Sequence, residues 1–407
     1  TTDKLADRSV TTDKLADSSV IGSKIADGVV TPAKLSVQVG LDYVTPQQFK
    51  TAENTWTQAF QLAVDSGHDV MIPTCNGEIY TLTEAHEGAG YCVIVPNTCK
   101  RIFGNGAMYR GTAVDIGTDG SVSLGGILAM HAPSGSTDVS MFRLADNHQG
   151  FTISDLRVSM GIRVYNATTQ TWTWNRSGVF IDAATSPMED KDIKITNVSI
   201  RYAALAIDFR GRGLTCKNDV FGGCLQYARI NFTGEDSYDS RGIWFDSCRL
   251  HSHALTHHCI DVESGHAYGL RVTNCLADHG MRQFIHAAEQ AINWTISGNT
   301  FQEVEASGPS TGYGRYQINL DAGAEGCSFD NNVLSGDSYG FVNVRGGTFT
   351  GCSVSGNVIT GGAGAALRLA GASAVDHCTI NGNVVKAKSD GFHVMTVSTG
   401  DTPYSVI

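Results

Sequence analysis

The sequence of 407 residues predicts an all-β chain whose body winds as a parallel β-helix, a solenoid in which each coil buries its apolar face against its neighbours. The prediction rests on a strand-like phrase that recurs in the second half and on the turn residues that close it. The phrase reads WTISGNTF from Trp294, CSFDNNVL from Cys327, CSVSGNVI from Cys352 and CTINGNVV from Cys378. Its alternating Ile, Val, Phe and Thr are typical of strands, and the repeat is too short for two helices.

Asparagine and glycine close each phrase because a sharp corner between strands needs the left-handed backbone that these residues tolerate. The shared asparagines are Asn299, Asn332, Asn357 and Asn383, in steps of 33, 25 and 26 residues. We expect their side chains to lie at equivalent corners and to hydrogen-bond from coil to coil.

The cysteines favour a buried column of thiols. Cys327, Cys352 and Cys378 open the same phrase, so they should stack as small apolar side chains. The total of 11 is odd, so at least one thiol must be free or paired between chains. Disulfides would need an oxidising compartment that nothing else in the sequence indicates.

Residues 1–40 carry a second repeat, of ten residues. Successive decades read TTDKLADRSV, TTDKLADSSV and IGSKIADGVV, followed by TPAKL. One apolar pair per decade cannot close a core within one chain, but several identical chains wrapped together can. We therefore expect an N-terminal repeat shaft and a homo-oligomer, with a disordered polar linker as the alternative.

Residues 41–82 are expected to cap the solenoid and lead into it. Phe49, Trp56 and Phe60 recur at helical spacing, which predicts a capping helix over 47–64 that stops at Asp65-Ser66-Gly67. Such a helix would cover the unpaired backbone edge of the first coil. Strands are expected at 69–73 and 79–82, and residues 83–407 should form the β-helix body.

The order of these elements resembles the start of the pectate-lyase-like β-helix superfamily. The resemblance rests on VTPQQF at 44–49, AVDSG at 63–67, VMIP at 70–73 and IY at 79–80. It departs at 50–54, where the family often has Gly and several Asp. Bacteriophage tailspikes and capsule depolymerases often begin in this way, and the TTDKLAD decades resemble shaft repeats of phage tail fibres. The resemblance implies a right-handed β-helix, a homotrimer, and a tailspike acting on a bacterial surface polysaccharide; right-handed crossovers are also the general preference.

Strand alternation gives the first catalytic candidates. In 258–263, inward-pointing Ile260 and Val262 send Asp261 and Glu263 outward together. Residues two apart on a strand face lie about 6.5 to 7 Å apart, which is compatible with the roughly 6.5 to 9.5 Å between the carboxyls of inverting glycosidases. We predict that Asp261 and Glu263 are the acid–base pair, with two solvated surface acids as the alternative.

A second acidic group lies in a Gly- and Ser-rich loop and consists of Glu235, Asp236 and Asp239. These residues are suited to acid–base catalysis or calcium binding, or to a solvated turn. Histidines also flank Asp261, and a metal site could combine it with His251 and His253. Their spacing is less regular than in structural zinc sites, so we expect no metal and no cofactor.

Aromatic and polar residues supply the predicted substrate contacts. Trp244 and Asp246 should face outward, Trp244 as a platform on which a sugar stacks. His286 should lie beside Asp261 on the following coil if Ile285 and Ala287 point inward. The last predicted substrate contacts are Tyr313, Tyr316 and Asp321. The two tyrosines belong to an insertion within 302–317, which we expect to project as a loop beside the outward Asp321. An interface between chains would explain these aromatics equally well.

The resemblance, together with the outward acids near histidine and tryptophan, implies a virion tailspike, assembled in the host cytoplasm, that binds a bacterial polysaccharide and cleaves it by hydrolysis or by elimination, with hydrolysis favoured. Its shaft would join other tail proteins. The alternatives are a receptor-binding tail fibre without catalysis and a purely structural fibre component. The net charge of -11 argues against a nucleic-acid partner, and no stretch approaches the roughly 20 apolar residues of a membrane span, so no membrane insertion is expected.

Overall fold

The structure is a computed structural model of the chain. It describes residues 42–73, 79–82, 85, 89–104, 127–130, 139–146, 148–160, 162–166, 171–175, 178–184, 190–224, 226–231, 242–251, 258–264, 268–278, 283–302, 316–336, 340–360, 365–386, 393–399 and 402–406. The predicted shaft over 1–40 lies outside these residues.

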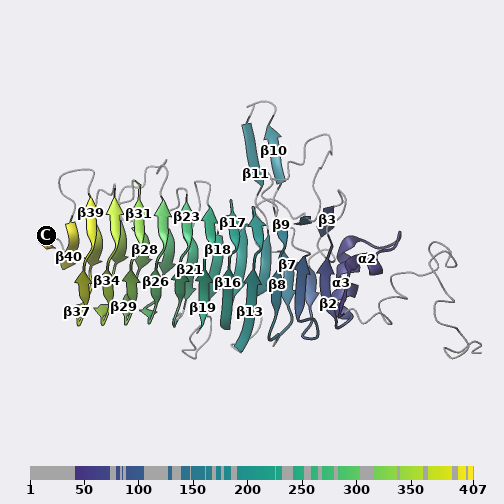
Figure 1. Cartoon of the computed structure of the whole chain (residues 1–407), viewed down its shortest axis with the longest axis horizontal. Coiled ribbons are helices and arrows are strands. Elements are labelled where there is room, and N and C mark those ends of the chain that lie inside the picture. Colours follow the sequence, from purple (N-terminus) through teal and green to yellow (C-terminus); the bar gives the residue numbers. More distant parts are fainter. Residues whose placement is uncertain are drawn as a thin grey trace, which may run out of the picture.

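Across the described residues, the strands stack into long parallel sheets that run the length of an elongated solenoid (Figure 1). Each regular coil places one strand in each of three sheets, so the chain visits sheet 3, sheet 1 and sheet 2 in turn. Sheet 1 contains β1 (Tyr43–Val44), β2 (Asp69–Ile72), β5 (Arg101–Gly104), β8 (Thr152–Ser154), β13 (Asp190–Thr196), β16 (Arg212–Lys217), β19 (Ile243–Asp246), β22 (Arg271–Thr273), β26 (Thr295–Ser297), β30 (Ser328–Asp330), β34 (Ser353–Ser355) and β38 (Thr379–Asn381).

Sheets 2 and 3 follow the same winding. Sheet 2 contains β3 (Ile79–Leu82), β6 (Ile127–Met130), β9 (Arg157–Ser159), β14 (Ser199–Arg201), β17 (Val220–Gly222), β20 (Arg249–His251), β23 (Leu276–Asp278), β27 (Thr300–Gln302), β31 (Val333–Ser335), β35 (Val358–Thr360) and β39 (Val384–Lys386). Sheet 3 contains β4 (Tyr91–Val95), β7 (Ser140–Leu144), β12 (Val179–Ala183), β15 (Leu205–Phe209), β18 (Gln226–Asn231), β21 (His258–Ser264), β24 (Gln283–Ala287), β28 (Tyr316–Leu320), β32 (Gly340–Val344), β36 (Ala365–Ala370), β40 (His393–Thr399) and β41 (Thr402–Val406).

Two smaller sheets complete the architecture. Sheet 4 contains β25 (Ala291–Ile292), β29 (Gly323–Glu325), β33 (Thr348–Thr350) and β37 (Ala374–Asp376). The antiparallel hairpin of β10 (Ile162–Asn166) and β11 (Thr171–Asn175) projects from the side of the solenoid (Figure 1).

The N-terminal end is covered by α2 (Pro46–Phe49) and α3 (Trp56–Asp65) (Figure 1). The prediction of one helix over 47–64 is wrong, because the backbone is extended at Lys50 and Thr55 caps a new helix by accepting from the Gln58 N–H. The predicted stop is confirmed, with Gly67 in the left-handed region at φ 77°. None of the described helices has the length and apolar character needed to cross a membrane.

Helix α3 buries its apolar face in the first coils. Phe60, Ala63 and Val64 are fully buried within the hydrophobic core. The ring of Tyr80 on β3 meets Trp56 edge-on at 4.8 Å and Phe60 at 5.9 Å. The helix therefore seals one end of the core, as the amphipathic pattern indicates.

The predicted asparagine ladder is confirmed. The side-chain Oδ1 of each asparagine after Asn299 accepts a hydrogen bond from the backbone N–H of the asparagine one coil earlier. The distances are 3.1 Å from Asn299 to Asn332, 2.9 Å from Asn332 to Asn357 and 3.0 Å from Asn357 to Asn383. Each side-chain amide in turn donates to a backbone carbonyl of the preceding coil, as Asn357 Nδ2 does to Phe329 at 2.8 Å. The residue before each asparagine has positive φ, at Gly298, Asn331, Gly356 and Gly382.

The cysteine column is also confirmed. The residues that follow Cys327, Cys352 and Cys378 pair in register, so the three cysteines occupy one corner of successive coils. Their thiols are free, the first two are buried, and Cys378 is half-buried at the C-terminal side. They pack as part of the core or against it, as small apolar side chains do.

Candidate functional site

A column of polar side chains runs along the outer face of sheet 3. Strand register aligns it from coil to coil, and it consists of Asp182, Asp208, Arg229, Asp261, His286, Asn319, Asn343 and Arg368. The residues on either side of each member belong to the core, as Ile260 and Val262 do for Asp261. Because alternate residues of a strand face opposite ways, the column points outward.

At its N-terminal part, the column is a run of ion pairs. Arg143 Nε donates to Asp182 Oδ2 at 3.0 Å, and Arg229 contacts both carboxylate oxygens of Asp208 at 3.2 and 2.5 Å. The Arg229–Asp208 pair is bidentate, and Asp182 also accepts a hydrogen bond from Ser140 Oγ at 3.2 Å. These aspartates are therefore held in place by the solenoid and are poorly suited to proton transfer with a ligand.

The column changes character at Asp261, His286 and Asp321. Asp261 Oδ1 lies 2.6 Å from His286 Nδ1, and His286 Nε2 lies 3.5 Å from Asp321 Oδ2. The His286 imidazole thus contacts one carboxylate on the preceding coil and one on the following coil. The prediction that His286 lies beside Asp261 is confirmed, with Ile285 and Ala287 in the core.

Electrostatics at His286 are set by this arrangement. Burial opposes the charged form, but the hydrogen bond and negative charge of Asp261, together with Asp321, outweigh it and raise the pKa of His286 above 6.5. The charged imidazolium is therefore favoured more than in a free histidine. As a donor on both nitrogens, it can hold both carboxylates at once.

Asp321 receives further donors at the edge of the column. Asn319 Nδ2 donates to its Oδ1 at 2.6 Å, and Arg345 Nη1 reaches the two oxygens at 3.3 and 3.4 Å. The Asp321 side chain is 31% exposed, whereas that of Asp261 is 8% exposed. Of the two carboxylates, Asp321 is the one that a bound molecule can reach.

Glu263 and Asp321 flank a small residue. Val262, Ala287 and Leu320 pair in register, so the next residues, Glu263, Ala288 and Asp321, occupy successive coils of one outward row. Glu263 is exposed, and Ala288 between the two acids is half-buried. Two strand spacings separate the backbones of the acids by about 9.6 Å. The short alanine side chain leaves room between the carboxyl groups.

Asp261 is less accessible than its outward orientation suggests. Gln226 Nε2 donates to Asp261 Oδ2 at 3.2 Å, and His286 occupies its other oxygen. The His258 ring stacks on the His286 ring with centroids 4.2 Å apart. His258, Asp261 and His286 each offer one donor atom within 4.8 Å of the others, an arrangement that could hold a metal ion.

Trp244 and Asp246 lie on a different sheet from Asp261. Their outward orientation is confirmed, because Ile243 and Phe245 are fully buried. Asp246, however, is only 8% exposed and accepts hydrogen bonds from Thr273 and Asn274, each at 3.2 Å. Because β19 belongs to sheet 1 and β21 to sheet 3, the expected joint site of Trp244 with Asp261 and Glu263 does not form within the chain.

Other residues predicted for the site also lie away from Asp261. Tyr316 begins β28 and is 2% exposed, so the prediction that it projects in a loop is wrong. His251 contacts Asp278 on sheet 2 rather than Asp261, which removes it from the metal site considered above. The remaining candidates lie outside the described residues: Glu235, Asp236, Asp239, Tyr313 and His253.

Sequence analysis assigned no role to three residues that shape the site: Asn319, which donates to Asp321, Arg345 and Ala288. Their signal is the strand register, since each aligns with or follows a residue already singled out on a neighbouring coil. Counting outward positions from each core Ile or Val would have found them.

No protein-family model matches the sequence, and no curated protein matches it. Solved structures do share its fold. The catalytic unit of a GH87 alpha-1,3-glucanase from Streptomyces thermodiastaticus matches 88% of this chain and 68% of its own, with 12% identity and a TM-score of 0.50. The surface adhesin PfbA of Streptococcus pneumoniae matches 90% of this chain and 94% of its own, with 11% identity and a TM-score of 0.51.

A tailspike of Escherichia coli bacteriophage HK620, solved with a pentasaccharide, matches 84% of this chain and 66% of its own, with 10% identity and a TM-score of 0.48. At these identities the similarity concerns architecture. The predicted right-handed parallel β-helix is confirmed.

Proposed function

We propose that this protein binds a bacterial surface polysaccharide on the outer face of sheet 3 and hydrolyses it there. The observation that carries the proposal is the pair of reachable carboxyls, Glu263 and Asp321, on either side of Ala288. Inverting glycosidases hold their carboxyls roughly 6.5 to 9.5 Å apart to place a water, and the backbone separation of about 9.6 Å is close to the upper end of that range. A glucanase of the same fold is in keeping with a polysaccharide substrate.

The contacts of Asp321 and the exposure of Glu263 support the following roles. Asp321 receives hydrogen bonds from Asn319 and Arg345 and faces the His286 imidazole, and its side chain is 31% exposed, so the carboxylate is both oriented and open to a water molecule. Asp321 is therefore the general base that takes a proton from the attacking water. Glu263 is the acid that protonates the departing glycosidic oxygen. Asp261 acts through His286 and is a positioning residue in this scheme, which replaces the predicted pair of Asp261 and Glu263.

Elimination is the second candidate, and the contacts of His286 favour it. Asp261 raises the basicity of the imidazole, and Arg345 is a nearby cation that could neutralise a uronate carboxylate. In that reaction a deprotonated His286 would abstract the proton next to the uronate. The products would be unsaturated and lighter by one water than hydrolysis products.

The particle and assembly belong to the same proposal. The decapeptides of residues 1–40 and the resemblance to tailspikes support a homotrimeric virion tailspike that joins other tail proteins through its shaft. Light scattering of the intact chain should give three times the monomer mass of 43.3 kDa. A monomer mass would contradict the trimer without affecting the carboxyl pair.

The test of the activity is mass spectrometry of purified capsular and O-antigen polysaccharides after incubation with the protein and its variants. Parent protein should release discrete oligosaccharides, and Glu263→Gln or Asp321→Asn should lower the rate at least about 100-fold while binding persists. Glu325→Gln, an exposed acid on sheet 4, is the matched control and should keep the parent rate. Parent-like rates in both site variants would overturn the assignment, and binding without products would indicate the non-enzymatic fibre.

A further inference from the structure

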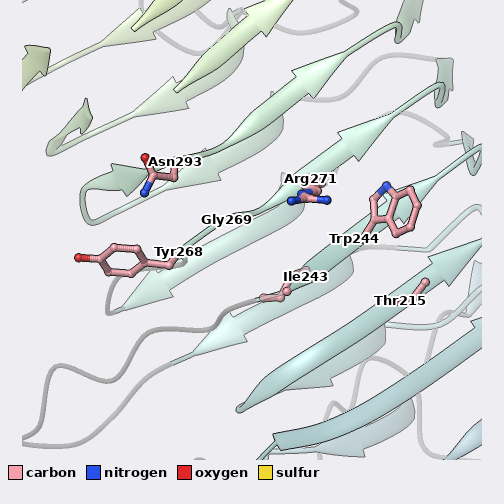
Figure 2. Close-up of a pocket in the computed structure, with 8 residues that line it drawn as sticks. Thr215, Ile243, Trp244, Tyr268, Gly269, Arg271 and Asn293 are labelled. Atoms are coloured by element: carbon pink, nitrogen blue, oxygen red, sulfur yellow. The ribbon is translucent and has the colours of Figure 1, made fainter. Parts of the chain in front are cut away.

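A second outward groove lies on sheet 1, away from the carboxyl pair. It has a volume of about 560 Å³ and is lined by Thr215, Gly242, Ile243, Trp244, Tyr268, Gly269, Arg271 and Asn293. Figure 2 shows Trp244 and Arg271 side by side at one end of the groove and Tyr268 and Asn293 at the other. The residues come from β16, β19, β22 and the corners between coils, so the groove crosses several coils.

Trp244 is fixed in place before any ligand arrives. Its indole Nε1 donates to Thr273 Oγ1 at 2.8 Å, and Thr273 Oγ1 donates to Asp246 Oδ1 at 3.2 Å. The ring is half-buried, although it stands on an outer face. A held aromatic ring is a low-entropy platform for the apolar face of a sugar. This explains the role of Asp246, which orients the platform through Thr273.

Arg271 is an exposed cation beside this platform. It pairs in register with Trp244 on the neighbouring strand. Other arginines on the solenoid, such as Arg143, Arg229 and Arg249, bind aspartates directly. Within the part of the chain that the structure describes, no acid forms an ion pair with Arg271. Its guanidinium therefore keeps its donors for an anionic group from outside.

Glycine keeps the groove open at its corner. Gly269 has φ 67°, a left-handed conformation that the corner requires, and a Cβ there would meet no atom within 4 Å. The space above this residue is therefore open. Asn293 and Tyr268 border it and can offer an amide and a hydroxyl for hydrogen bonds with sugar hydroxyls.

We propose that this groove binds an acidic sugar residue, a uronic acid or a similar carboxylated sugar, as a non-catalytic site. The sugar ring stacks on Trp244, and its carboxylate lies against Arg271. The net charge of -11 does not prevent this, because charges more than about 8 Å away are largely screened at physiological salt. The inference takes its ligand class from the proposed function but does not depend on catalysis at sheet 3.

The test is ¹⁹F NMR of the full chain labelled with 5-fluorotryptophan, in which Trp244→Phe assigns the Trp244 resonance. Sodium methyl β-D-glucuronide should shift that resonance saturably at concentrations up to about 100 mM, well above a millimolar dissociation constant. The neutral counterpart, methyl β-D-glucoside, should bind at least about 10-fold more weakly. Arg271→Gln, a change at an exposed position, should remove the preference for the glucuronide.

A resonance that neither sugar moves, or that both move equally in the parent protein, would overturn the proposal. So would unchanged glucuronide affinity in Arg271→Gln. Glu263→Gln should retain the full response, since it lies on sheet 3. A Trp244 response in a protein without hydrolytic activity would support acidic-sugar binding in the groove and reject the proposed hydrolysis at sheet 3. The failure of one proposal can therefore be distinguished from the failure of the other.

Discussion

Replacing Asp219 with Asn should stabilise the solenoid. Asp219 occupies the corner position held by Asn299, Asn332 and Asn357 in later coils, and it is fully buried. Its Oδ1 accepts the Val198 N–H at 2.8 Å, as the ladder asparagines do from their preceding rung. In those rungs, the amide nitrogen donates to a carbonyl of the preceding coil, and the equivalent carbonyl here belongs to Ile195. An ionised carboxylate cannot donate to it, but a protonated one can.

Burial accordingly raises the pKa of Asp219 from 3.8 to about 8, against the lowering effect of two backbone hydrogen bonds. At pH values between 3.8 and about 8, the folded chain therefore holds one more proton than the unfolded chain. The free energy of unfolding therefore falls by about 1.4 kcal/mol per pH unit as the pH rises. This contribution is complete below about pH 4 and is lost progressively up to about pH 8.

At pH 7 the loss amounts to about 4 kcal/mol, since the pH is then roughly three units above the unfolded pKa. Asp219→Asn supplies the donor permanently and should recover an energy of that order at pH 7, and about 1 to 2 kcal/mol at pH 5. Urea unfolding of both proteins from pH 5 to pH 8 measures the difference. Asn332→Asp, the reverse change in the same ladder, should destabilise most at the highest pH.

A parent protein whose stability does not fall between pH 5 and pH 8, together with an Asp219→Asn variant that is no more stable at pH 7, would refute this reasoning. The result would mean that Asp219 is ionised in the folded chain.

Three further predictions concern the ladder and the site. Asn357→Ala should cost about 3 kcal/mol or more in urea unfolding, because it leaves the Phe329 carbonyl and the Asn332 N–H without their partner; a loss below about 1 kcal/mol would contradict the ladder's role. His286→Gln should remove stability that the parent has below pH 6.5 and loses as the pH rises through the raised pKa of His286, so pH-dependent melting curves of the two proteins should converge at alkaline pH. Dialysis against EDTA should leave glycan release unchanged, because Asp261 and His286 already satisfy each other; loss of activity that zinc restores would assign a metal to His258, Asp261 and His286.

Local pattern was sufficient to predict the coil but not the arrangement of its faces. Asn332 and Cys327 could be placed because the left-handed corner and the buried column each impose a residue type at a fixed point of every coil. Trp244 and Asp261 were joined wrongly because strand alternation tells which way a side chain points but not which sheet its strand enters. That assignment depends on where each corner falls. Asp219 was missed because it breaks the asparagine pattern, although Asn218 before it has the corner's positive φ.

The burial of Asp261 was likewise beyond the sequence. Its outward direction followed from Ile260 and Val262, but its cover comes from Gln226 and His286, which are 35 and 25 residues away. Contacts between coils depend on the length of every intervening turn. The outward direction of His286 could be predicted only on the condition that Ile285 and Ala287 point inward. Strand alternation alone does not decide this, because Phe284 is apolar and is buried as well.

The most direct test of the proposed carboxyl pair is the configuration of the newly formed reducing end, followed by ¹H NMR from the first turnover of a cleaved polysaccharide. Acids separated by two coils, with Ala288 between them, leave space for a water and predict inversion at the anomeric carbon. Retention of configuration would require carboxyls only about 5 to 5.5 Å apart and would contradict the pairing of Glu263 with Asp321.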